Sequence, residues 1–186
     1  MSSGPVLLVT GPPGAGKSTV ARLVAERFDP SICLESDWFW TTIVRGAIPP
    51  WLPAADVQNR TVLRACAAAA AELALGGYSV VVDGILGPWS LDLFTAELRR
   101  TGGGVHYVVL RPPREVALAR ATARGGDERV PGHRALTEEG PIRQVWESFR
   151  HLGPYEGHVV DNGAFDPEHT ASVVWRRFTE GTDRLW

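Results

Sequence analysis

Short apolar runs alternate with segments of helical spacing along the whole chain. Five runs are rich in branched apolar residues, which is typical of strands buried in a sheet. These runs cover residues 6–9, 31–35, 78–82, 105–110 and 158–160. The segments of helical spacing cover residues 17–28, 56–75, 90–100, 113–124, 141–152 and a last stretch after 166. The alternation predicts an α/β fold in which helices cover both faces of a five-stranded parallel sheet.

Polar residues mark the starts of two predicted helices. Asp56 is expected to be an N-cap, because it directly precedes a long helical pattern. Asp166, Pro167 and Glu168 have the residue types preferred at the N-cap, the first helical position and the first turn. The aromatic and proline-rich stretch 37–53 has no clear secondary-structure pattern.

A glycine-rich segment joins the first predicted strand to the first predicted helix. It consists of Gly11, Pro12, Pro13, Gly14, Ala15, Gly16, Lys17 and Ser18. This order matches the P-loop pattern G-x-x-x-x-G-K-S/T in its expected strand-to-helix setting. Glycines let backbone N–H groups point inward around an anion, and the helix N-terminus adds partial positive charge. We therefore expect this segment and the adjoining Thr19 to bind nucleotide phosphates, with Lys17 on the β- and γ-phosphates and Ser18 on Mg²⁺.

The composition excludes several classes of partner. The 186 residues carry a net charge of −2, which gives no reason to expect nucleic-acid binding. Two cysteines and scattered histidines form neither a disulfide framework nor a metal-ligand pattern. The N-terminus lacks a signal-peptide pattern, and no apolar run approaches the roughly 20 residues of a membrane span. The sequence thus favours a cytoplasmic protein without membrane association.

Lys17 is the only lysine among 19 basic residues, and its position excludes one class of nucleotide-binding protein. With this lysine in the P-loop, the chain has no Asn-Lys-x-Asp segment of the kind that reads guanine in Ras-type GTPases. Asp83 is followed by Gly84, so this strand ends neither in the GTPase switch motif nor in the Asp-Glu pair of large ring-forming ATPases. A small kinase remains the best interpretation.

The P-loop, the acid after the second strand, the Asp-Gly after the third and the spaced arginines resemble one known group. This is the small P-loop kinase group, which contains adenylate, gluconate and shikimate kinases. Within the group, the chain most resembles chloramphenicol phosphotransferase-like ATP-binding proteins. The resemblance implies the strand order 2-3-1-4-5 in a three-layer P-loop NTPase fold. It also implies ATP and Mg²⁺ as cofactors, and one domain over residues 1–186 with a small lid at about 113–135.

Two carboxylates follow predicted strands at the expected ligand-binding edge of the sheet. Asp37 follows the second strand, and the resemblance implies that it accepts the proton of the substrate hydroxyl or helps to hold Mg²⁺. It could instead be only the N-cap of the next helix. Asp83 ends the third strand, where it would order water around Mg²⁺ or contact the substrate. Glu35 and Ser36 are weaker candidates for neighbouring contacts.

Arginines near the predicted lid suit the charge of a transferring phosphoryl group. Arg120 and Arg124 are four residues apart, so they share one helix face. The resemblance implies that they close over the phosphates as catalytic and nucleotide-binding residues, and Arg129 is a third candidate. Asn162 follows the last predicted strand, where related kinases have a loop that lies against the adenine. The resemblance therefore implies that Asn162 is a nucleotide-binding residue. Surface arginines without a ligand would explain the same pattern.

Aromatic residues cluster after the second and third predicted strands. Trp38, Trp40 and Trp51 follow the presumed base, and Trp89 follows Asp83 by six positions. Together they would line a mainly apolar acceptor pocket for a ring-bearing or bulky substrate. Ordinary core packing is the alternative for each of them.

The sequence predicts an ATP- and Mg²⁺-dependent phosphotransferase that moves the γ-phosphoryl group to a hydroxyl of a small molecule. The acceptor is expected to be an antibiotic or other natural product, or a sugar-like compound. One alternative is a nucleotide-binding regulatory protein or a slow ATPase, and another is a nucleotide monophosphate kinase. The expected oligomeric state is a monomer or a homodimer.

Overall fold

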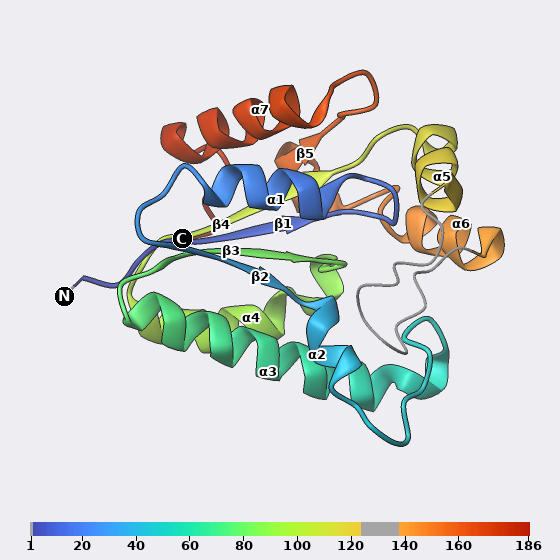
Figure 1. The fold of residues 1–186 in the computed structure, drawn as a ribbon, viewed down its shortest axis with the longest axis horizontal. Helices are drawn as coiled ribbons and strands as arrows, with labels where there is room; N and C mark the ends of the chain where they lie inside the picture. Colours follow the sequence, from blue (N-terminus) through green and yellow to red (C-terminus); the bar gives the residue numbers. More distant parts are fainter. Residues whose placement is uncertain (1, 124–137) are drawn as a thin grey trace.

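A parallel sheet of five strands forms the centre of the protein (Figure 1). The computed structural model describes residues 2–123 and 138–186. The strands are β1 (Val6–Thr10), β2 (Ser31–Glu35), β3 (Ser79–Gly84), β4 (Val105–Leu110) and β5 (Val159–Val160). Their order is β2-β3-β1-β4-β5, and every neighbouring pair runs parallel. The predicted three-layer fold and its strand order are confirmed.

Helices follow the strands in the predicted alternation. They are α1 (Lys17–Ala25), α2 (Asp37–Thr41), α3 (Asp56–Leu75), α4 (Leu91–Leu98), α5 (Arg114–Ala123), α6 (Glu139–Ser148) and α7 (Pro167–Glu180). Short 3-10 turns cover η1 (Pro53–Ala55), η2 (Pro88–Ser90), η3 (Arg99–Thr101) and η4 (Gly153–His158). Among residues 2–123 and 138–186, none of the helices combines the length and the hydropathy that a membrane span requires.

The helices bury the two faces of the sheet in separate cores. Figure 1 shows α1 and α7 on one face and α3 and α4 on the other. Successive side chains of a strand point to opposite faces, so Leu7 and Val9 pack with the α1–α7 side, whereas Val6 and Leu8 pack with the α3–α4 side. The two layers of helices explain why β1 is buried at every position.

The structure corrects the expected role of Asp56. Ala55, not Asp56, occupies the N-cap position of α3, and Asp56 is the first helical residue. The physical reason is that the turn η1 leads directly into α3, so the backbone is already helical at Ala55. The expectation for the last helix is confirmed, because the Asp166 side chain accepts a hydrogen bond from the His169 backbone N–H.

The lid expected at about 113–135 is described only in its first part. Helix α5 lies with α6 beyond the carboxyl ends of the strands (Figure 1). Arg124 and Arg129, the other arginines expected in the lid, lie outside the described residues.

Candidate functional site

The backbone of the P-loop depends on glycines with positive φ. Gly11, Gly14 and Gly16 have φ values of 147°, 78° and 85°. Gly14 also lies against α5, because a Cβ there would be 2.0 Å from the carbonyl oxygen of Ala117. Gly16 is the N-cap of α1 in the left-handed conformation, which turns the chain from the loop into the helix. The loop therefore presents the positive end of α1 to an anion.

Lys17 and Ser18 place a cation and a hydroxyl beside the carboxylate of Asp83. Lys17 Nζ donates a hydrogen bond to the carbonyl oxygen of Pro12 at 3.1 Å. Burial raises the pKa of Asp83 above its ordinary value, and the negative charge of nearby Asp37 raises this pKa further. The charge of Lys17 and a hydrogen bond with the Ser18 side chain act in the opposite direction and lower it. Lys17, Ser18, Asp37 and Asp83 are therefore close enough to interact at one end of the sheet.

The oxygen atoms at this end suit a magnesium ion. Asp83 is 5% exposed, and its Oδ1 has no hydrogen-bond partner among the described residues. An unpaired buried carboxylate oxygen is costly unless a cation or a donor satisfies it. Oxygen ligands from one or two side chains, completed by phosphates and water, are what Mg²⁺ prefers. Ser18 and Asp83 therefore fit the ion, although the described residues contain no group of three or more His, Cys, Asp or Glu suited to a metal.

Helix α2 carries Asp37 to the end of β3. The backbone N–H of Ser36 donates to the carbonyl oxygen of Asp83 at 2.8 Å, and a Cβ on Gly84 would be 2.1 Å from Ser36 Oγ. Asp37 follows as an exposed residue in the first turn of α2. Glu35 instead forms an exposed ion pair with Arg22 at 3.3 Å. Asp37, in contrast to Glu35, forms no ion pair with any of the described residues.

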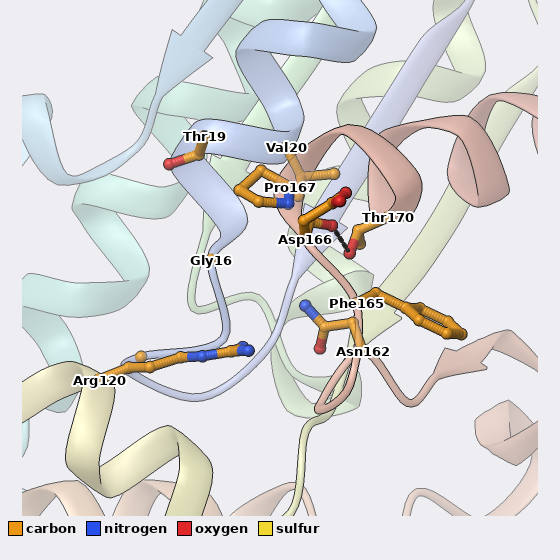
Figure 2. Close-up of a pocket in the computed structure, with 10 residues that line it drawn as sticks. Gly16, Thr19, Val20, Arg120, Asn162, Phe165, Asp166, Pro167 and Thr170 are labelled. Carbon is orange, nitrogen blue, oxygen red and sulfur yellow. Dashed lines mark hydrogen bonds between the residues drawn. The ribbon is translucent and has the colours of Figure 1, made fainter.

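A cavity of about 370 Å³ lies between the P-loop, α5 and the loop that follows β5. Figure 2 shows Arg120, Asn162 and Phe165 around it, contributed by α5 and by the loop after β5. Arg120 Nη2 donates to the carbonyl oxygen of Gly163 at 3.1 Å, and Asn162 Nδ2 donates to the carbonyl oxygen of Ala15 at 2.9 Å. The P-loop lines one part of the cavity, and apolar side chains such as Phe165 and Pro167 line another. A nucleotide needs both, because its phosphates are charged and its base is largely apolar.

Sequence reasoning missed part of this cavity. Phe165 and Thr170 line it together with Thr19, yet neither was singled out from the sequence. The available signal was their position, since both follow the last strand at the edge where ligands bind. Asn162 was expected near the adenine, and the structure places it in the cavity wall with its amide bound to the P-loop.

The four tryptophans expected in the acceptor pocket fall into two groups. Trp38 and Trp89 are 58% and 51% exposed. Trp40 packs against the core, and its Nε1 donates to Asn59 Oδ1 at 3.0 Å. Trp51 is half-buried. The structure therefore leaves two of the four indoles available to a ligand at this edge.

Comparison with known proteins identifies the fold. A family model described as an AAA domain matches residues 6–144. Among solved structures, a sugar kinase from Janibacter superposes with a TM-score of 0.66 at 23% identity, covering 97% of this chain and 98% of that one. The APS kinase of Mycobacterium tuberculosis, in complex with AMPPNP and APS, gives a TM-score of 0.67 at 16% identity, with coverages of 96% and 99%.

The tunicamycin resistance protein of Deinococcus radiodurans is similar over the same length. Its TM-score is 0.64 at 18% identity, and 97% of this chain and 98% of that chain are covered. The comparison with curated protein sequences produced no match. At these identities the structural neighbours show the fold alone.

Proposed function

The chain belongs to the AAA domain family of P-loop proteins, and from this premise we propose that it is a kinase for a small molecule. It would transfer the γ-phosphoryl group of ATP to a hydroxyl in a Mg²⁺-dependent reaction. The observation that carries the proposal is the convergence of Lys17, Ser18, Asp83 and Asp37 at one end of the sheet, beside a cavity that opens on the P-loop.

Each residue has a defined part in this reaction. The P-loop amides and Lys17 hold the β- and γ-phosphates, and the cavity beside Arg120 takes the nucleoside. Ser18 and Asp83 would hold Mg²⁺, which supplies positive charge against the phosphate oxygens. Asp37 accepts the proton of the acceptor hydroxyl, whose oxygen then bonds to the γ-phosphorus as the bond to the β-phosphate oxygen breaks. ADP and a phosphate ester are the products.

The structural neighbours support this type of reaction. The APS kinase structure contains AMPPNP together with APS, so a chain of the same fold holds an ATP analogue and a small acceptor at once. The sugar kinase and the tunicamycin resistance protein point to different acceptors. A sugar-like compound and an antibiotic or other natural product therefore remain the two acceptor classes of the proposal.

The decisive measurement is ATP consumption over a panel of hydroxylated compounds with the wild type and Asp37→Asn. The substitution keeps the size of the side chain but removes the base, so we expect turnover to fall on the order of 10²-fold or more while nucleotide affinity is kept. Asp56→Asn is the matched control, because Asp56 is also an exposed acid in the first turn of a helix. Near-native turnover of Asp37→Asn would contradict the assignment.

The same panel separates the kinase from its rivals. A nucleotide-binding regulatory protein or slow ATPase predicts that no compound stimulates ATP consumption and that a protein partner is retained only with nucleotide. A nucleotide monophosphate kinase predicts that nucleoside monophosphates alone stimulate it. Stimulation by a neutral alcohol supports the proposed activity.

A further inference from the structure

Ser36 is a buried polar residue whose hydroxyl has no partner. It directly follows β2, it is 1% exposed, and its Oγ forms no hydrogen bond with the described residues. It occupies the N-cap position of α2, where a serine side chain usually accepts a hydrogen bond from the first turn, but no such bond forms. Burial of an unpaired hydroxyl costs stability. Neither helix capping nor hydrogen bonding therefore accounts for a serine at this position.

The side chain of Ser36 instead packs against the backbone at Gly84. A Cβ on Gly84 would lie 2.1 Å from Ser36 Oγ and 3.0 Å from Ser36 Cβ. The φ of Gly84 is outside the left-handed region, so the backbone conformation would also suit alanine. Position 84 thus needs glycine for space, and Ser36 fills the space that the missing side chain leaves.

This contact lies where three neighbouring strands end. Gly84 pairs with Thr10 in the register of β3 and β1, and the backbone N–H of Ser36 donates to the carbonyl oxygen of Asp83 at 2.8 Å. Thr10 Oγ1 accepts a hydrogen bond from the backbone N–H of Leu86 at 2.7 Å. The chain that leaves β3 is therefore held on one side by β1, which leads directly into the P-loop, and on the other side by Ser36.

The same contact holds the first turn of α2, which carries the proposed base. The backbone N–H of Phe39 donates to the carbonyl oxygen of Ser36 at 3.0 Å, so the turn that contains Asp37 begins at Ser36. Figure 1 shows α2 directly beyond the end of β2. Asp37 is near enough to Asp83 for its charge to raise the pKa of Asp83. A base has to be held at a set distance from the reacting atoms, because misplacement by about 1 Å can lower a rate on the order of 10²-fold.

We propose that Ser36 is a positioning residue, which packs against Gly84 and thereby sets the place of the Asp37 carboxylate relative to the P-loop. This inference rests on the proposed function and adds the contact by which the base is held. It requires that positions 36 and 84 act as a pair. A side chain fits on one side of the contact but not on both.

Moving the side chain from position 36 to position 84 tests this pair. Gly84→Ala should displace Ser36 and lower ATP hydrolysis, with water as the probe acceptor, by roughly 10²-fold, while the affinity for AMPPNP and Mg²⁺ is kept. The double variant Ser36→Gly/Gly84→Ala leaves only one side chain at the contact and should restore most of the lost turnover. Gly140→Ala is the matched control, because its φ is also outside the left-handed region and a Cβ there meets none of the described atoms within 4 Å.

The unpaired hydroxyl allows function to be separated from stability. Ser36→Ala removes a costly buried group together with its contact to Gly84, so we expect slower ATP hydrolysis with an unchanged or higher Tm. Ser90→Ala is the comparison. Ser90 is also 1% exposed, but its hydroxyl donates to the carbonyl oxygen of Gly87 at 2.8 Å, so the Tm of this variant should fall.

Hydrogen exchange follows the position of α2 without relying on turnover. The backbone amides of Ser36 and Phe39 should exchange faster in Gly84→Ala than in the wild type and slow down again in the double variant. Unchanged exchange in Gly84→Ala, a double variant as slow in hydrolysis as Gly84→Ala, or native hydrolysis by Ser36→Ala would each overturn the inference. Exchange that the double variant restores, in a protein whose ATP consumption no alcohol stimulates, would support the contact and count against the proposed kinase.

Discussion

The side chain of Asn162 donates a hydrogen bond from Nδ2 to the carbonyl oxygen of Ala15 at 2.9 Å. It joins the loop after β5 to the middle of the P-loop, 147 positions away in sequence. Both residues are buried. Because the bond must run from the amide nitrogen to a carbonyl, it also fixes the orientation of the Asn162 amide. The wall of the nucleotide cavity and the phosphate loop are therefore one connected unit.

Removal of this bond should weaken nucleotide binding. Asn162→Ala leaves the Ala15 carbonyl oxygen buried without a partner, which costs about 1–3 kcal/mol, so we expect ATP to bind roughly tenfold more weakly. Asn162→Asp should be worse, because it sets a carboxylate against that carbonyl oxygen and close to the phosphates. Isothermal titration calorimetry with ATP and Mg²⁺ measures both effects. Asn59→Ala is the control, since Asn59 bonds to Pro50 and Trp40 in the acceptor region.

Lys17 should not be replaceable by arginine. The Lys17 ammonium lies over the P-loop, bonded to the Pro12 carbonyl oxygen, and a compact charge there fits between the loop and the phosphates. Lys17→Arg keeps the charge but not the shape, and we expect kcat/KM to fall on the order of 10²-fold. Arg22→Lys, an exposed change one turn later in α1, should leave the rate unchanged. Near-native kinetics of Lys17→Arg would show that only charge matters at this position.

Two glycines distinguish the stability that comes from packing of the P-loop on α5 from the cost of a strained backbone conformation. Gly14 and Gly46 have φ values of 78° and 79°, so alanine is equally strained at both. A Cβ at Gly46 meets nothing within 4 Å, whereas one at Gly14 would be 2.0 Å from the Ala117 carbonyl oxygen. We expect Gly46→Ala to lower the free energy of unfolding by about 1–2 kcal/mol and Gly14→Ala by about 3 kcal/mol or more. Chemical denaturation measures the difference; equal losses would mean that α5 yields to the added methyl group.

A buried ion pair secures the C-terminal segment. Arg177 and Asp183 approach to 2.6 Å, and the Asp183 side chain is fully buried beside His158. Arg100 and Glu72 approach to the same 2.6 Å but are 45% and 66% exposed. Asp183→Asn should cost about 3 kcal/mol because it leaves Arg177 without its counter-charge. Glu72→Gln should cost less than about 1 kcal/mol, and thermal unfolding of both variants tests whether burial decides the effect.

The contribution of Asp183 should also depend on pH. Burial alone would raise the pKa of Asp183, but hydrogen bonds from His158 and Arg177 outweigh it and hold this pKa below its ordinary value. A lowered pKa means that the folded state favours the carboxylate, so the stabilisation is complete above the pKa of the unfolded chain, about 4. It is lost as the pH falls through the folded-state pKa. The stability gap between wild type and Asp183→Asn should thus be constant near neutral pH and narrow below about pH 4; a gap that widens there would contradict the assignment.

Local patterns in the sequence were sufficient to predict the secondary-structure elements and the P-loop. The strand order came from the resemblance to small P-loop kinases, but the strands, the P-loop and the N-cap Asp166 follow from residues a few positions apart. Asp56 shows the limit of such reasoning, since the preceding turn η1 changes which residue takes the N-cap.

Only the tertiary structure decided which side chains meet across the sheet. The sequence did not distinguish Trp40, bound to Asn59, from Trp38, which stays exposed, because the same residue type fits a core or a binding surface. It also gave no sign that Asn162 binds Ala15, since that contact forms only after the strands and helices between them have packed. Hydrophobic periodicity and short motifs determine the elements and the phosphate loop, because their physical causes are local. The partners of buried polar groups and the exposure of each indole depend on chain segments far apart in sequence, so the assembled fold alone sets them.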